Sequence, residues 1–539
     1  MFKKEIYILA FLFAVVTQLA AQNYNIYNER TFDNLFNMNA DTVSNFHSSF
    51  LPYSQNEFNA VTTPYDSILN ELRVDSKSKF FNYFFNENLI QLINTNKNGV
   101  IEKSIINPII NTGFTYEKNN IESQSLIETS VGLNLQSNLG KKWSGQLLFL
   151  VDKSNYASYI DELVQDKNIS PGYGYSENDR SFFTQGNITF TADKNFTFQA
   201  GYGKNFIGDG YRSLFLSDNA NSYPYLKITA NIWKLKYMAL YSVYQDIRGS
   251  NGVASDYFTK YSTIHYLSFN ATKWLNVGFF ESIIFQAQEG QFYRGFDINY
   301  LNPVIFLRPT EYSQGSSDNA LLGGSLKIKI KKKNILYGQI ILDEFLLNEL
   351  KSGNGWWANK YGIQVGLKMY DFLWVKNLRF QLEYNIVRPF TYSHSYKPTE
   401  ISTLQNFAHF NAPLAHPLGA NFNEIFTSLS YHKKRWIFEG TSTIAQIGLD
   451  TNFATSVGQD LYRPNNDRAQ DYGYETGGGL RTDILNTTLK VSYVINPKSR
   501  FTVSGGITNR AYRNNVETVS NNLFFIGLKT NIINRYTDF

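Results

Sequence analysis

The stretch Leu378-Arg-Phe-Gln-Leu-Glu-Tyr-Asn-Ile386 alternates strictly between apolar and polar side chains. Leucine, phenylalanine, tyrosine and isoleucine occupy one face, and arginine, glutamine, glutamate and asparagine occupy the other. A period of two residues predicts a β-strand with one apolar and one polar face. The same alternation recurs after about residue 105, for example in 235–243, 275–279 and 489–495. We therefore expect an all-β fold.

The connections between the expected strands alternate between very short and long. The short ones are 140–142, 193–195, 232–234, 272–274, 331–334, 372–377, 433–434 and 496–499. This alternation is typical of outer-membrane barrels, which have tight periplasmic turns and long outer loops. Counting from a first strand near 108–116 to a last strand near 522–534 predicts a transmembrane antiparallel β-barrel of about 18 strands within residues 105–539. A large secreted β-sandwich or propeller is the alternative.

The composition excludes several other classes of protein. The chain has 539 residues, of which 43% are hydrophobic and 18% charged, and its mean hydropathy of -0.31 is too low for several membrane-spanning helices. A net charge of +5 without a basic helix or finger motif argues against a nucleic-acid partner. The absence of cysteine excludes disulfides, thiol catalysis and cysteine-ligated zinc.

The first hundred residues differ from the rest. Lys3 and Lys4 precede an apolar run at 6–16 and the pair Ala20-Ala21, which predicts a signal peptide over residues 1–21 and an outer-membrane location. An uncleaved anchor is the alternative. Residues 22–104 are expected to form a partly helical periplasmic segment, because apolar residues follow a helical spacing between 66 and 92. It would either cover the periplasmic mouth of the barrel or dock a periplasmic partner, and Pro64 and Asp75 would divide it into two helices.

Two longer stretches carry a resemblance to a known family. They are Gly201-Tyr-Gly-Lys-Asn-Phe-Ile-Gly-Asp-Gly-Tyr-Arg-Ser-Leu-Phe-Leu-Ser-Asp218 and Arg294-Gly-Phe-Asp-Ile-Asn-Tyr-Leu-Asn-Pro-Val-Ile-Phe-Leu-Arg-Pro-Thr-Glu311. The chain resembles the Wzi-like capsule-assembly outer-membrane proteins, and with Asn45-Phe-His-Ser-Ser-Phe-Leu-Pro-Tyr53 it is most similar to their RemB-like branch, which is linked to gliding motility. The resemblance implies a plugged 18-stranded barrel that holds or organises exported polysaccharide. The family has no catalytic motif to transfer.

Candidate polysaccharide-binding residues follow from the chemistry of sugars. Sugar C–H faces pack on aromatic rings, while amides and charges bind hydroxyl groups. The outer candidates are Trp356, Trp357, Tyr392 and Tyr396, followed by Tyr156, Tyr159, Tyr472 and Tyr474. The alternative is that these rings belong to the aromatic girdle at the membrane interface.

Four charged residues are candidates inside the lumen. Asp209 and Arg212 accompany a glycine-rich turn at 208–210, and Arg294 and Arg308 lie in the long connection 287–319. The apolar middle of that connection, 300–307, predicts that it folds into the barrel and narrows it. Charges of both signs there would either pair with each other or contact the ligand.

The sequence gives no sign of catalysis or of a metal. His394, His409 and His416 share one connection with Glu400, but their spacings of 15 and 7 residues match no helical zinc pair, so we expect surface histidines. Nucleophile-elbow, phosphate-loop and His-Glu-x-x-His motifs are absent from the sequence. We predict a protein without catalytic activity or cofactor that binds or anchors surface polysaccharide. Outer-membrane lipid and periplasmic or surface motility proteins are further expected partners, and the alternatives are a diffusion porin and a structural component of a motility or secretion complex.

Overall fold

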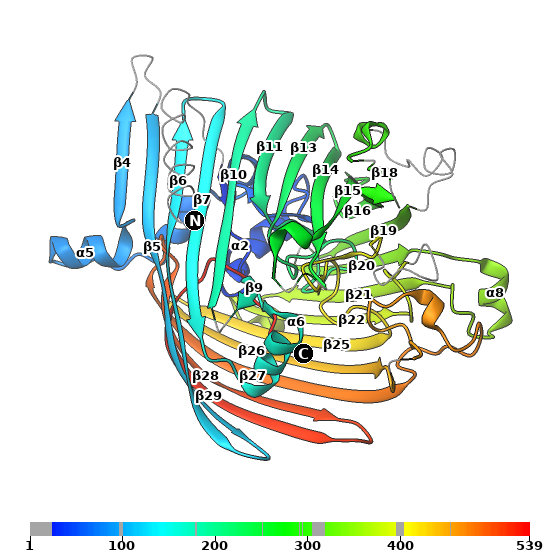
Figure 1. Cartoon of the computed structure of the whole chain (residues 1–539). Helices are drawn as coiled ribbons and strands as arrows, with labels where there is room; N and C mark the ends of the chain where they lie inside the picture. The colour runs from blue at the N-terminus through cyan, green and yellow to red at the C-terminus, as the bar shows by residue number, and fades with distance from the viewer. Residues whose placement is uncertain are drawn as a thin grey trace.

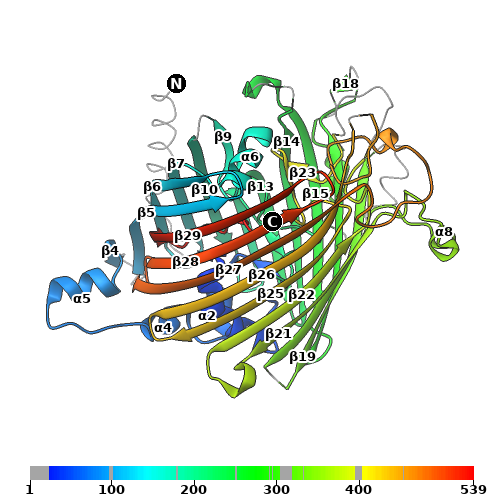
Figure 2. The same ribbon diagram turned by 90° about the horizontal axis from the view of Figure 1, so that it is seen from below.

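The computed structural model describes residues 24–95, 101–177, 180–248, 250, 252–289, 292–293, 295–303, 318–331, 333–394, 404–452 and 454–539. Within these residues, eighteen antiparallel strands form one closed sheet, which β29 (Thr518–Thr530) completes by pairing with β5 (Ile101–Asn119) (Figures 1 and 2). The strands between them are β6 (Ser123–Leu139), β7 (Trp143–Ser154), β10 (Arg180–Thr191), β11 (Phe196–Gly203), β13 (Tyr223–Ile232), β14 (Leu235–Asp246), β15 (Phe258–Phe269), β16 (Leu275–Gln286), β19 (Asn319–Ile330), β20 (Asn334–Leu342), β21 (Tyr361–Tyr370), β22 (Leu378–Val387), β25 (Phe422–Lys433), β26 (Trp436–Leu449), β27 (Leu480–Asn496) and β28 (Phe501–Arg513). The predicted barrel and its strand number are confirmed.

The eight predicted short connections all join neighbouring strands at one end of the barrel. The two ends of the sheet differ from expectation. β5 begins seven residues earlier than predicted, at Ile101, and β29 ends at Thr530, because the last nine residues leave the barrel wall. Among the described residues, no helix is both long enough and apolar enough to cross a membrane.

The faces of β22 show which side of the sheet meets lipid. Leu382 and Tyr384 are each 41% exposed on the outside, whereas Glu383 and Asn385 are fully buried inside. A soluble sandwich would bury the apolar face, so the observed arrangement is that of a barrel whose apolar surface faces lipid.

The first part of the N-terminal segment lies inside the barrel (Figure 2). Its short strands β1 (Asn25–Ile26), β2 (Phe50–Leu51) and β3 (Tyr53–Ser54) accompany the helices α2 (Arg30–Thr42), α3 (Gln55–Val61) and α4 (Tyr65–Asn70). Phe32, Phe36 and Phe58 form its buried core, which packs against Ile437 and Val494 of the wall. These residues therefore fill the inner half of the lumen.

The region 66–92, expected to be helical, is divided by the structure. α4 is followed by a break, then by α5 (Lys79–Asn86) and by β4 (Ile90–Thr95), which pairs with β5. β4 and α5 project outside the barrel (Figure 1). Asp75 lies in the break at residues 71–78 and Pro64 directly precedes α4, but the expected helix is wrong for residues 90–92, which belong to β4.

Three outer connections and the C-terminal tail fill the other half of the lumen. The first connection carries α6 (Ser158–Lys167), β8 (Ile169–Ser170) and β9 (Gly174–Glu177), and the second, 204–222, carries β12 (Phe206–Ile207). The third is described at 388–394 and 404–421 and carries β23 (Ala408–His409) and β24 (Ala412–Pro413). A large apolar cluster joins the second and third connections, with Leu214, Phe215 and Leu414 fully buried. The tail at 531–539 packs against the same cluster through Phe539.

The expected inward fold of the connection 287–319 is wrong for its described part. Tyr241 and Thr263 are on the outward faces of β14 and β15, yet they donate hydrogen bonds to the carbonyls of Leu301, at 3.0 Å, and Tyr300, at 3.1 Å. Tyr300 is fully buried in a cluster with Phe285 on the same outer side. The residues around η2 (Ile298–Leu301), which follow the short hairpin β17 (Gln288–Glu289) and β18 (Phe292–Tyr293), therefore cover the outer wall.

Candidate functional site

The inner half of the lumen is held by a buried charge cluster around Asp41. Its carboxylate lies 2.6 Å from the ammonium of Lys327 and 3.0 Å from that of Lys368, and it accepts a hydrogen bond from Tyr370 at 2.6 Å. Burial alone would raise the pKa of Asp41, but the two ammonium groups outweigh it and hold that pKa well below its usual range. Asp41 is therefore ionised and fixes α2 to β19 and β21.

Asp209, a predicted ligand-binding residue, belongs to this cluster. Its carboxylate lies 3.2 Å from the ammonium of Lys327 and accepts a hydrogen bond from the hydroxyl of Ser48 at 2.5 Å. The loop 204–222 thus meets the N-terminal segment through Asp209. The contact is structural, since its side chain is 7% exposed.

Arg212 ties the connection 204–222 to the barrel wall and to the C-terminal tail through ion pairs. Its guanidinium lies 2.8 Å from the carboxylate of Glu424 on β25 and 3.1 Å from that of Asp538 in the tail. Glu424 is also 2.8 Å from the imidazole of His416. Arg212 is fully buried, so it has no free face for a polysaccharide, and its role in the structure is that of an ion-paired staple.

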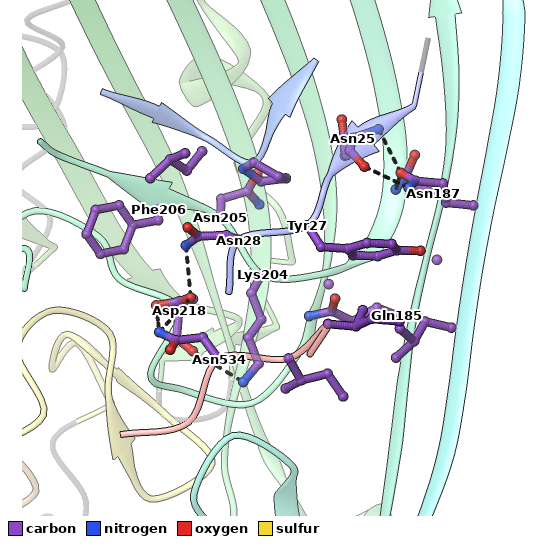
Figure 3. Close-up of a pocket in the computed structure, with 18 of the residues that line it drawn as sticks. Asn25, Tyr27, Asn28, Gln185, Asn187, Lys204, Asn205, Phe206, Asp218 and Asn534 are labelled. Carbon is purple, nitrogen blue, oxygen red and sulfur yellow. Dashed lines mark hydrogen bonds between the residues drawn. The ribbon is translucent and has the colours of Figure 1, made fainter. Parts of the chain in front are cut away.

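Small polar cavities remain between these segments. One of about 70 Å³ lies between residues 25–28, the start of the loop 204–222 and the tail (Figure 3). There the ammonium of Lys204 donates to the carbonyl of Gly172 at 2.9 Å, and burial lowers the pKa of Lys204 to about 8. A larger chamber of about 340 Å³ lies between α2, β26–β29 and the tail. Their polar linings suit ordered water.

The outer mouth carries an aromatic patch built from two connections. Residues 354–357 follow α8 (Leu347–Ser352), and they pair with 471–474 of the connection that contains η4 (Asn465–Asp467). The amide of Trp357 donates to the carbonyl of Asp471, and the amide of Tyr474 donates to that of Gly355, both at 2.9 Å. Arg388 donates to the carbonyls of Trp356 and Tyr474 and so clamps the two segments together. Gly355 has a φ of +70° at the closest approach of the two backbones, where a Cβ atom would lie 2.8 Å from the nitrogen of Tyr474.

Within this patch, the aromatic rings differ in accessibility. Tyr472 is 48% exposed, Trp356 and Trp357 are half-buried, and Tyr474 is buried. The guanidinium of Arg468 lies 4.1 Å from the ring centre of Trp357, and Arg468 also pairs with the exposed Asp471 at 2.8 Å. Trp356, Tyr472, Arg468 and Asp471 therefore combine ring faces with charged hydrogen-bonding groups, as sugar binding requires. We call these four residues the outer patch.

Several residues that the sequence predicts to be accessible are buried or half-buried. Tyr392 is fully buried, and its hydroxyl donates to the carbonyl of Leu214 at 2.7 Å, because its loop folds into the lumen. For the same reason His409 and His416 are buried rather than on the surface, and burial lowers the pKa of His409 to about 3. Tyr156 is also buried, and Tyr159 donates to the carbonyl of Thr537 at 2.8 Å.

Three predicted site residues, Arg294, Arg308 and Tyr396, lie outside the described residues, as do Glu400 and the expected signal peptide. Within the described part of the chain, no group of three or more histidine, aspartate or glutamate side chains is placed to hold a metal ion. Arg468 and Asp471 are not among the residues predicted from the sequence. Two opposite charges three residues apart in a long loop do not by themselves indicate a binding site. Only the backbone pairing with 354–357 places them beside the aromatic rings.

Comparison with known proteins supports the fold. No protein-family model and no curated protein matches the sequence. Among solved structures, the chain is similar to Wzi of Escherichia coli, described as an outer-membrane protein involved in group 1 capsule assembly and a carbohydrate-binding β-barrel, with a TM-score of 0.54 and 12% identity over 93% of this chain and 98% of that one. OpdL of Pseudomonas aeruginosa gives a TM-score of 0.40 and 9% identity over 79% of this chain and 98% of that one. The chain is an outer-membrane β-barrel.

Proposed function

We propose that this barrel binds exported surface polysaccharide at its outer mouth and anchors it to the cell without chemical change. The observation that carries the proposal is the outer patch, in which two separate connections bring Trp356, Tyr472, Arg468 and Asp471 together. The carbohydrate binding described for Wzi supports it, as does the sequence resemblance to Wzi-like proteins. The RemB-like stretches extend the proposal to polysaccharide that serves gliding motility.

The filled lumen argues against the porin alternative. Buried ion pairs fix the N-terminal segment and the loop 204–222 to the wall at Asp41 and Arg212. Opening a channel would require breaking several such pairs, each of which costs about 3–5 kcal/mol when one partner is left unpaired. A bilayer conductance of porin size for the unchanged protein would contradict this reasoning.

Binding of the host's own purified polysaccharide to the detergent-solubilised protein tests the proposal. Removing a stacking ring costs about 1 kcal/mol, so Trp356→Ala and Tyr472→Ala should each weaken binding about fivefold. Trp374→Ala is the matched control, because Trp374 is 94% exposed in the turn between β21 and β22 at the opposite end of the barrel. Equal binding by all three variants would move the site away from the outer patch, with Arg294 and Arg308 as the next candidates.

A further inference from the structure

α5 and β4 expose apolar side chains outside the barrel. Phe80, Phe81 and Phe84 of α5 are 71%, 50% and 47% exposed. The buried residue of this helix is Asn86. A helix that faced water would be expected to bury its phenylalanines and expose its asparagine, so the polarity of α5 is inverted for an aqueous surface.

The polar side of α5 is fixed to the rim of the barrel. Arg435, in the turn between β25 and β26, donates to the side-chain oxygen of Asn86 at 2.7 Å and to the carbonyl of Phe85 at 3.0 Å. Asn496, at the end of β27, donates to the carbonyls of Phe84 and Glu87 at 2.7 and 2.8 Å. These bonds hold the helix with its aromatic side pointing away from the barrel.

The tryptophans of the short turns give the level of the membrane boundary. Five of the seven tryptophans in the chain lie in or beside these turns, namely Trp143, Trp233, Trp274, Trp374 and Trp436. A ring of aromatic residues at one end of a barrel marks the interface between acyl chains and headgroups. Trp436 follows Arg435 directly, so the anchor point of α5 lies at this interface.

β4 continues the apolar outer surface of the wall. It pairs with residues Ile101–Ile106 of β5, beyond Thr112, where the pairing of β5 with β29 begins. Ile90 and Leu92 are 43% and 60% exposed on the same face as the outward residues of β5. Figure 1 shows β4 beside β5 with α5 projecting from its base. Lys77 and Lys79 are exposed at the start of α5.

We propose that residues 79–93 form a lipid-binding clip that inserts the aromatic side of α5 and the outer face of β4 into the periplasmic leaflet of the outer membrane. The clip is continuous with the lipid-facing wall and lies at the tryptophan ring. Its phenylalanines bury apolar area at the boundary between headgroups and acyl chains, while Lys77 and Lys79 attract anionic phospholipid headgroups. The clip adds to the apolar area that the barrel buries in the periplasmic leaflet, and it directs the N-terminal segment back into the lumen.

Site-specific fluorescence on the full chain tests this clip. Because the chain has no cysteine, Phe81→Cys and Phe84→Cys each provide one labelling site for an environment-sensitive dye. Asp75→Cys is the control, since Asp75 is 84% exposed in the same segment. In vesicles of phosphatidylethanolamine and phosphatidylglycerol, we expect a blue shift at 81 and 84 and quenching by lipids brominated near the headgroup end of the acyl chains. The dye at 75 should show neither change and should be quenched by iodide in water.

Two results would overturn the clip. Iodide quenching at 81 and 84 as strong as at 75, with no effect of brominated lipids, would show that the helix faces water. If the dyes at 81 and 84 became shielded only after addition of a periplasmic extract, the surface would instead dock a protein. Retained heat-modifiable migration of each labelled variant on gels would show that the barrel itself has folded.

Discussion

Replacing Asp41 by asparagine should weaken the docking of the N-terminal segment in the lumen without disturbing the barrel wall. The asparagine would keep the volume of the side chain but leave the ammonium of Lys368 without its ion pair, whereas Lys327 would keep Asp209 at 3.2 Å. Removing one partner of a fully buried pair costs about 3–5 kcal/mol, and we expect about 3 kcal/mol because one cation keeps a partner. That cost corresponds to an increase of about 150-fold in the opening equilibrium of α2.

Hydrogen exchange of the backbone amides of Arg30–Thr42 measures this opening directly. Exchange in α2 should become about 150-fold faster in Asp41→Asn, while β27 and β28 stay protected. Asp75→Asn, which removes an exposed pair with Arg73, should change the exchange of α2 little, because solvent screens exposed ion pairs. Adding Lys368→Met to Asp41→Asn should restore much of the protection by removing the orphaned charge. Exchange in Asp41→Asn as slow as in the unchanged protein would refute the idea that these charges hold the plug.

Two further predictions concern the same lumen. Burial lowers the pKa of His47 to about 3 while the N-terminal segment is in the lumen, where the imidazole forms hydrogen bonds with Ser268 and Asn270. If the N-terminal segment left the lumen, His47 would become protonated below about pH 6.5. Docking should therefore weaken as pH falls from about 6.5 to 4, by up to about 1.4 kcal/mol per unit, and a His47→Gln variant should lose this slope in exchange rates corrected for intrinsic pH dependence. Arg212→Met should free the C-terminal tail, because Asp538 loses its ion pair with Arg212 while Glu424 keeps His416 at 2.8 Å. Limited proteolysis with mass spectrometry should show cleavage within 531–539 in this variant but not in Arg481→Met, whose pair with Asp483 is exposed, and a protected tail in both would contradict the staple.

The part of the fold that the sequence predicted best is the wall. The period of two in residues 378–386 identifies a strand, and the eight short connections give the number of strands. In a membrane every strand must form its backbone hydrogen bonds with neighbouring strands, so these strands close into a barrel. That pattern alone does not say which face is inside. The structure shows that the polar face is inside, because Glu383 and Asn385 are fully buried and Glu383 accepts a hydrogen bond from the backbone amide of Arg212 in the loop 204–222.

The contents of the lumen and the outer patch could not be predicted from local sequence, because connections without a periodic pattern take the position that their partners offer. Tyr300 would satisfy burial equally well inside or outside. It lies outside, whereas the N-terminal segment, the loop 204–222, the described parts of the loop 388–421 and the tail occupy the lumen. Tyr392 and Trp356 look alike as loop aromatics, yet one is buried and the other stays half-exposed at the mouth. The sequence by itself determined a lipid-facing barrel and its number of strands. Only the tertiary structure decided what fills it and which residues remain free to bind, since both depend on contacts between segments hundreds of residues apart.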